Sequence, residues 1–132
     1  MITETRAPGR SLGINTANVG DVTRQIEAGF PHEVFARFRD FSQLPEEQIA
    51  IAARCSPTSQ LSPDESDRMM RMALVFERAV DLFDGNHEAA KSWMTSPNRA
   101  LGQETPLAMT RTSFGANVVS DLIGQVEHGI FS

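Results

Sequence analysis

The sequence predicts an all-α fold, with short helices in the N-terminal part and a larger helical region in the C-terminal part. Apolar residues recur at spacings of three and four, most clearly in the second half, and proline and glycine occur where such segments would begin or end. No segment shows the alternation of apolar and polar residues that is typical of a half-buried strand. The 132 residues suffice for one compact domain, or for two small parts that share a core.

The N-terminal part divides into an arm and a group of short helices. Residues 1–19 contain Pro8, Gly9 and Gly13 and few large apolar side chains, which predicts a mobile arm. Residues 20–60 predict three short helices: residues 21–28, ended by Gly29; a helix that has Pro31 in its first turn; and a helix from Pro45 through Ala53.

Four phenylalanines in this region, Phe30, Phe35, Phe38 and Phe41, carry more apolar surface than such short helices easily hide. One interpretation is that they form a homodimer interface. The other is that they pack in the core of their own chain. The sequence leaves both interpretations open.

Residues 61–132 begin with the clearest helix start signal in the chain. Ser62 is the expected N-cap, Pro63 occupies the first turn, and Glu65 stands at the third position of a capping box. The helix is expected to end at Gly85, and two pairs at i,i+4 spacing are expected on its wet side, Asp64 with Arg68 and Asp67 with Arg71. Its buried stripe is formed by Met69, Met72, Ala73, Phe76, Val80 and Phe83.

Further start signals follow along the chain. Asn86 is expected to cap a short helix that contains Trp93, and Thr105 with Pro106 repeats the cap-plus-proline signal. A last helix is predicted from about Ala116 to Glu127. The apolar stripe of this last helix comprises Val119, Leu122, Ile123 and Val126.

Composition argues against several function classes. The net charge is −5, which is unusual for a dedicated nucleic-acid binder, and no stretch approaches the about 20 apolar residues of a membrane span. Cys55 is the only cysteine, so a thiolate-rich metal site is excluded and a passive thiol is expected. No phosphate loop, zinc motif or nucleophile turn is present. We therefore expect a cytoplasmic protein without a cofactor, a metal site or catalytic residues.

Residues 61–132 resemble the toxin-binding region of the Xre/MbcA/ParS antitoxins, which are partners of RES-domain toxins. The resemblance covers more than half of the chain, in order. It rests on Leu61–Arg68, Ala79–Gly85, Ala89–Met94, Ser96–Gly102, Thr105–Leu107 and Leu122–Ser132.

The resemblance implies a type II toxin–antitoxin module in which the antitoxin inhibits an NAD⁺-degrading RES-domain toxin. It implies that the C-terminal region covers the toxin's active site. We expect the antitoxin to be a homodimer within a hetero-oligomeric toxin–antitoxin complex. The residues expected to contact the toxin are Trp93, Pro97, Asn98, Arg99, Leu101, Gly102, Glu127, His128, Gly129, Ile130, Phe131 and Ser132.

Residues 127–132, which we call the tail, contain two large apolar side chains. Ile130 and Phe131 either fold back onto the last helix or serve as apolar anchors in a cleft of the partner. In the second case, Glu127 and the terminal carboxylate would occupy a site that normally binds an anionic dinucleotide.

The N-terminal part departs from the family pattern. Family members usually carry an Xre-like helix-turn-helix for operator binding, which needs a recognition helix with basic residues. Here the stretch between Ala53 and Ser62 leaves room for at most about one helical turn, so the motif is degenerate. Residues 20–60 then serve for dimerisation or for residual DNA binding, the latter through Arg54, Thr58 and Ser59. The alternative function is a helix-turn-helix transcriptional repressor that has no toxin-inhibiting role.

Overall fold

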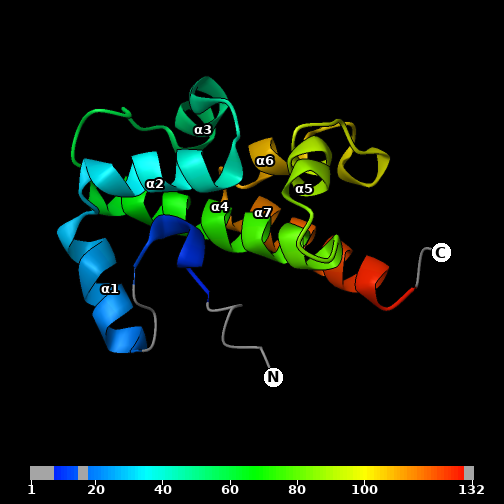
Figure 1. The fold of residues 1–132 in the computed structure, drawn as a ribbon, viewed down its shortest axis with the longest axis horizontal. Helices are drawn as coiled ribbons and strands as arrows, with labels where there is room; N and C mark the ends of the chain where they lie inside the picture. Colours follow the sequence, from blue (N-terminus) through cyan, green and yellow to red (C-terminus); the bar gives the residue numbers. More distant parts are fainter. Residues whose placement is uncertain (1–7, 15–17, 130–132) are drawn as a thin grey trace.

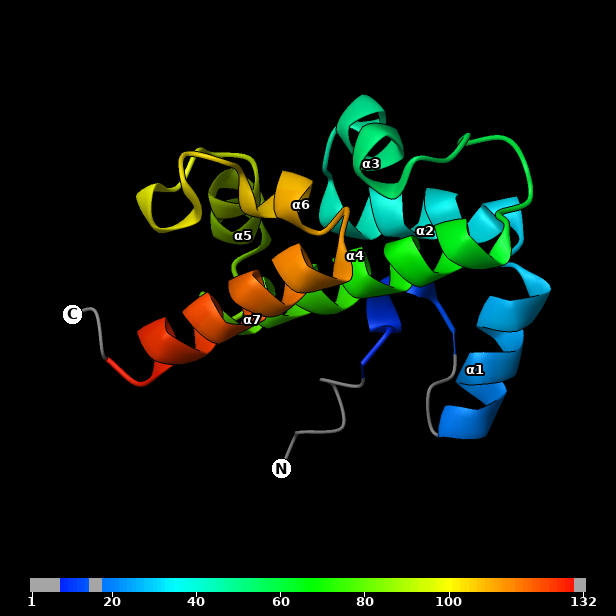
Figure 2. The ribbon, with the colours of Figure 1, turned by 180° about the vertical axis from the view of Figure 1, so that it is seen from behind.

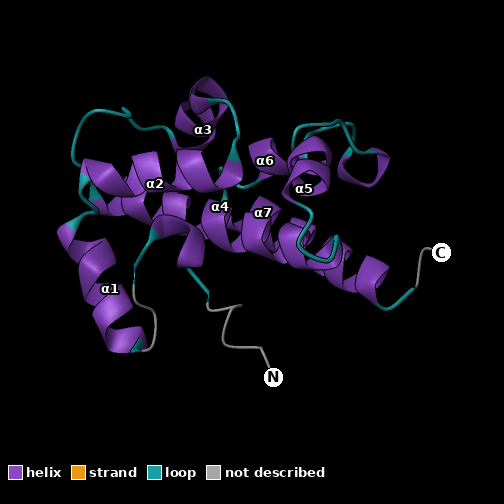
Figure 3. Ribbon diagram, viewed as in Figure 1, coloured by secondary structure: helices purple, strands orange, loops and turns teal. Residues whose placement is uncertain are grey.

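The computed structural model describes residues 8–14 and 18–129, and all regular secondary structure in these residues is helical (Figure 3). The all-α prediction is therefore confirmed for the described part of the chain. The elements are, in chain order, the 3-10 helix η2 (Arg10–Leu12), α1 (Val19–Ala28), α2 (His32–Ser42), α3 (Glu46–Ala53), α4 (Pro63–Leu82), α5 (His87–Met94), the 3-10 helix η3 (Arg99–Leu101), α6 (Pro106–Met109) and α7 (Ser113–Glu127).

Helix α4 is the longest element, and the other helices are arranged around it (Figures 1 and 2). It packs against η2, α1, α2, α3, α5 and α7. Because the N-terminal helices and the C-terminal helices both contact α4, one continuous core joins the two parts of the chain. The buried apolar residues of α4 are Met69, Met70, Met72, Ala73, Val75, Phe76, Ala79 and Val80.

The predicted capping box at the start of α4 is confirmed. The Glu65 backbone N–H donates to Ser62 Oγ at 3.1 Å, and the Ser62 N–H donates to Glu65 Oε1 at 2.8 Å. The expected Asp67–Arg71 pair is present, but the expected Asp64–Arg68 pair is wrong. Arg68 Nε donates instead to the Ala53 carbonyl oxygen at 2.7 Å, at the end of α3, where a helix leaves its last carbonyls without intrahelical partners.

The phenylalanines of the N-terminal part are core residues of their own chain. Phe30, Phe35 and Phe38 are buried, and Phe41 is half-buried against the same core. The Phe38 and Phe76 rings meet edge to face with centroids 5.8 Å apart. The interpretation of these residues as a homodimer interface is therefore wrong, and the core interpretation is confirmed.

The arm expected over residues 1–19 is wrong for residues 8–14, which pack into the fold. Leu12 is fully buried, and the buried carboxylate of Glu77 on α4 holds the segment. Glu77 Oε1 accepts from the Gly9 N–H at 2.8 Å, and Oε2 accepts from the Ser11 N–H at 2.9 Å and from the Ser11 hydroxyl. Residues 1–7 and 15–17 of the expected arm lie outside the described residues.

Helix α7 begins three residues before its predicted start. Thr112 caps it, since Thr112 Oγ1 accepts from the Gly115 N–H at 2.9 Å. Phe114 is 76% exposed, so the first turn does not continue the apolar stripe from which the start at Ala116 was predicted. A Cβ at Gly115 would collide with the Met109 carbonyl oxygen, and glycine therefore allows α7 to approach α6 closely.

Among the described residues, no helix combines the length and apolar character that crossing a bilayer requires.

We expect Glu77→Ala to lower the free energy of unfolding by about 3 kcal/mol, because two buried N–H groups and a hydroxyl lose their acceptor. Urea unfolding of the purified variant measures the loss. Asp121→Ala removes an exposed carboxylate and serves as the matched control, with a change within about 0.5 kcal/mol. Equal effects of the two substitutions would contradict the assignment of Glu77 as the anchor of residues 8–14.

Candidate functional site

Most of the described residues that were expected to contact a partner lie at one end of the molecule. Trp93 is on α5, the loop between α5 and α6 contains η3, and Glu127 is the last residue of α7 (Figures 1 and 2). Both views place the end of α7 and this loop at the end of the molecule opposite α1. Ile130, Phe131 and Ser132 lie outside the described residues.

A shallow groove connects α5, the loop and α7. We call it the Trp93 groove; it has a volume of 220 Å³ and is lined by Trp93, Asn98, Ala100, Leu122 and Val126. Trp93 is half-buried against the core, while Val126 is 42% exposed. The walls are mostly apolar, which suits a large apolar side chain. Sequence reasoning identified Trp93 and Asn98, but it missed the last three, although Leu122 and Val126 belong to the predicted stripe of α7.

The loop between α5 and α6 closes on itself through Asn98. Its side-chain oxygen accepts from the Ala100 N–H at 2.9 Å, its N–H donates to the Glu104 carbonyl at 3.1 Å, and its carbonyl accepts from the Gln103 N–H at 2.9 Å. Gly102 adopts a φ of 66°, a left-handed conformation that glycine accepts without strain. Asn98 therefore organises the loop.

The residues of this loop differ in what they offer a partner. Leu101 is only 7% exposed and anchors the loop to the core, so its expected role as a surface contact needs correction. Pro97, Arg99 and Gly102 are exposed and remain accessible. The loop thus presents a small exposed surface that is held from beneath by a buried leucine.

The end of α7 carries charged groups and a chain reversal. Glu127 Oε1 pairs with Arg78 Nη2 at 3.0 Å, and Arg78 Nη1 donates to the Ser120 carbonyl at 3.1 Å. Both members of the ion pair keep more than a third of their side-chain surface exposed, so the pair is accessible. His128 follows as the exposed C-cap, and Gly129 has a φ of 74°. Sequence reasoning missed Arg78 because no local pattern links residues 49 positions apart.

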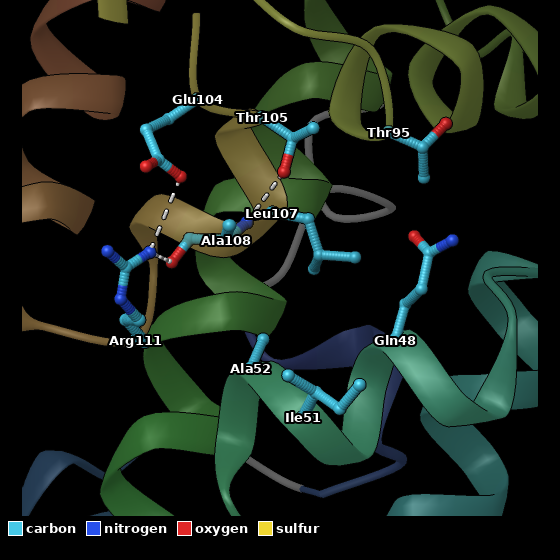
Figure 4. A pocket seen from close by; sticks show the side chains of 9 residues that line it. All are labelled: Gln48, Ile51, Ala52, Thr95, Glu104, Thr105, Leu107, Ala108 and Arg111. Carbon is cyan, nitrogen blue, oxygen red and sulfur yellow. Dashed lines mark hydrogen bonds and ion pairs between the residues drawn. The ribbon is translucent and has the colours of Figure 1, made fainter. Parts of the chain in front are cut away.

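A second and larger groove lies between α3 and α6, with a volume of 510 Å³ (Figure 4). Ile51, which is 70% exposed, and Leu107 provide its apolar surface. Arg111 lies at its rim, where Nη1 is 3.7 Å from Glu104 Oε1 and donates to the Ala108 carbonyl at 2.7 Å (Figure 4). Sequence reasoning missed this groove, because it joins helices that are far apart in the chain. The other residues that line it are Gln48, Ala52, Thr95 and Thr105.

The three candidate DNA-binding residues are exposed and lie outside any helix. Arg54 ends α3 in a left-handed conformation, with a φ of 54°, and Thr58 and Ser59 lie exposed in a turn. No helix occurs between Ala53 and Pro63, all of whose residues the structure describes, so the predicted lack of a full recognition helix is confirmed.

The described residues offer little for catalysis or metal binding. Burial, with a smaller contribution from Glu65, raises the pKa of the Cys55 thiol to about 11, so the thiol is protonated at neutral pH and is a poor nucleophile. The His87 ring packs against Phe41, with centroids 4.9 Å apart. In residues 8–14 and 18–129, no cluster of three His, Cys, Asp or Glu side chains could hold a metal ion.

Comparison with known proteins places the chain in a family, and a family model matches its C-terminal part. Residues 78–129 match the family model described as the antitoxin Xre/MbcA/ParS C-terminal toxin-binding domain. The chain is 32% identical over 139 residues to a Yersinia enterocolitica protein named "Antitoxin Xre", with 98% of this chain and 94% of the relative covered. It is 33% identical over 132 residues to a Photorhabdus laumondii protein of the same name, with 93% and 89% covered.

We expect Leu101→Ala to cost about 3 kcal/mol of stability, because it removes the buried anchor of the loop. Arg99→Ala, two residues earlier on the exposed side of the same loop, is the matched control and should change stability by less than about 0.5 kcal/mol. Thermal and urea unfolding measure both. A Leu101→Ala variant as stable as the control would contradict the anchoring role.

We expect alkylation of Cys55 at pH 8 to be on the order of 100-fold slower in the folded protein than in urea, because the raised pKa leaves little thiolate. The rate in the folded protein should rise only as the pH approaches about 11, whereas the unfolded thiol ionises near its ordinary value of 9.0. Iodoacetamide labelling followed by mass spectrometry measures the rates. Equal rates in the two states would show that burial does not suppress the thiolate.

Proposed function

Because the chain belongs to the Antitoxin Xre family, with an Xre/MbcA/ParS toxin-binding domain at residues 78–129, we propose that it inhibits a RES-domain, NAD⁺-degrading toxin by covering the toxin's active site. Membership in this family makes it an antitoxin of a toxin–antitoxin system, whose partner is a protein toxin. The identity of the toxin, the covering mechanism and a cytoplasmic location for both proteins are parts of the proposal.

The observation that supports the covering mechanism most directly is the continuous surface made by the Trp93 groove, the closed loop and the end of α7. Interfaces are usually dominated by a few apolar anchors in preformed hollows, surrounded by polar residues. Trp93 and Val126 provide the apolar centre here, and the exposed residues Arg99 and Glu127 are next in sequence to the lining residues Ala100 and Val126. The hydrogen bonds of Asn98 hold the loop in shape before binding, which lowers the entropy lost on association.

The negative charge at the end of α7 is complementary to the positively charged toxin site that would bind an anionic dinucleotide. The C-terminal end of a helix carries partial negative charge on its last carbonyl groups, and Glu127 adds a carboxylate there. Glu127 is already paired with Arg78, so a cationic group of the toxin would share or replace that partner. Both groups are partly exposed, so this exchange costs little desolvation.

A homodimer remains part of the proposal, but its interface must use residues other than the buried phenylalanines. The groove between α3 and α6 is larger than the Trp93 groove and has the exposed side chain of Ile51 at its surface. We therefore place a dimer contact there rather than at the end of the molecule that faces the toxin.

Binding to operator DNA is less well supported. Residues 54–62 contain no helix, and Arg68 Nε is engaged with the Ala53 carbonyl, which leaves Arg54 as the main basic group near the turn. If the protein were a repressor without toxin-inhibiting activity, the domain that matches the toxin-binding family model would have no function.

We expect full-length antitoxin to stop NAD⁺ loss caused by its cognate RES-domain toxin, and a variant lacking residues 127–132 to inhibit at least about tenfold more weakly. Co-purification and an NAD⁺ assay measure binding and inhibition. Glu27→Ala is the control, because this exposed residue lies on α1 at the opposite end of the molecule (Figure 1). Full inhibition by the truncated protein would contradict a role for the tail.

We expect the free antitoxin to give no sequence-specific gel shift with the DNA upstream of its own gene. Any binding to this DNA should be weak and should be lost at about 200 mM salt. A specific complex that survives this salt concentration and is abolished by Arg54→Ala would instead support the repressor alternative.

A further inference from the structure

The Trp93 groove lies along the apolar stripe of α7, close to the last described residues of the chain. Leu122 and Val126 form its wall on α7, four residues apart on one face of the helix. The opposite wall comes from Trp93 on α5 and from Ala100 in the loop. The groove therefore has apolar surface on both sides and opens beside the last turn of α7, where Val126 is partly exposed.

The backbone at the end of α7 turns back towards the helix. The Gly129 N–H donates to the Val126 carbonyl at 3.0 Å, and Gly129 has a φ of 74°. A glycine in this left-handed conformation commonly ends a helix, and the apolar residue that follows it commonly packs against the helix's own last turns. In this chain the residues that follow are Ile130 and Phe131.

Distance also favours this segment as the occupant of the groove. Each residue extends the chain by at most about 3.6 Å, so Ile130 and Phe131 must lie within about two residue lengths of Gly129. Gly129 is itself hydrogen-bonded to Val126, which lines the groove. Two large apolar side chains are thus tethered beside a mostly apolar hollow, and burying them there removes both surfaces from water.

We propose that in the free protein the Trp93 groove binds Ile130 and Phe131 of the same chain, and that toxin binding draws them out. The docking in the free protein stands on the groove and on the chain reversal at Gly129. The release rests on the proposed function above. The contact would keep an apolar segment covered until the toxin offers a better site, and it would leave the emptied groove free to contact the toxin.

Trp93 is the protein's single tryptophan, so its fluorescence reports on the groove directly. We expect a protein that ends at Gly129 to show red-shifted emission and about twofold stronger quenching by acrylamide, since the indole loses its apolar cover. The double substitution I130S/F131S should reproduce the change, and Ser132→Ala is the matched control. Circular dichroism and thermal unfolding check that each variant is folded. Emission and quenching identical to those of the full-length protein would overturn the docking.

A spin label provides a second readout that does not depend on truncation. A nitroxide on Ser132→Cys should quench Trp93 strongly, while the same label on Ser59→Cys, in the turn before α4, should not. Selective labelling is practical because the native Cys55 is half-buried and has a pKa of about 11. Equal quenching from the two positions would overturn the proposal.

The release is tested with 5-fluorotryptophan incorporated into the antitoxin alone. We expect one fluorine resonance, shifted by the truncation after Gly129, and shifted again when full-length antitoxin binds the toxin. In the complex, deleting residues 130–132 should no longer move the resonance. If the fluorescence tests show docking in the free protein but no toxin is inhibited, the proposed function fails while the docking stands. If inhibition occurs and the truncation leaves Trp93 unchanged, the docking fails alone.

Discussion

Helix α4 carries apolar side chains on more than one face, and the burial of all these faces determines how the other elements are arranged around it. The N-terminal helices cover one side, where Phe38 packs edge to face on Phe76. Helices α5 and α7 cover another, and residues 8–14 close the remaining edge by placing Leu12 in the core. Glu77 is a buried charged residue of α4, and its carboxylate is satisfied by the backbone and the hydroxyl group of that closing segment. The N-terminal part is thus required for the stability of α4, whether or not it has a binding role of its own.

The candidate contact surface is rigid because the helices that form it pack on α4. Helix α7 packs along α4, and α5 packs across it, so the two walls of the Trp93 groove are fixed by the same central helix. The loop between them is held by a buried leucine and by hydrogen bonds to one asparagine. A contact surface built in this way loses little conformational entropy on binding, because its shape is set before the partner arrives.

The helix starts could be predicted from capping residues in the local sequence, whereas contacts between residues far apart in the sequence could not. Ser62, Asn86 and Thr105 each accept a hydrogen bond from a backbone N–H of the helix they begin, and such caps can be recognised within four residues of sequence. Phe30, Phe35 and Phe38 are buried because they pack in the core around α4. The local sequence around these residues does not show whether they pack in their own chain or against a partner. Nor does it show the Glu127–Arg78 pair or the carboxylate that anchors residues 8–14. The predicted contact residues were therefore found largely at one end of the molecule, while Leu122, Val126 and Arg78 came only from the packing.

The segment between α3 and α4 is held at both ends, which explains why it contains no helix. The Leu61 N–H donates to the Phe30 carbonyl at 2.9 Å, and the Phe30 N–H donates to Ser66 Oγ at 2.7 Å, so the start of α4 is tied to the junction of α1 and α2. A Cβ at Gly29 would collide with the Leu61 carbonyl oxygen, and its φ of 87° also requires glycine. The hydrogen bond from Arg68 to the Ala53 carbonyl also joins α3 to α4, so the short connection is fixed at both ends and contains no helix. A helix-turn-helix protein uses this position to enter DNA, whereas here it connects two helices. The Trp93 groove and the groove between α3 and α6 are both lined in part by apolar residues, and residues 78–129 of the family match contribute to both.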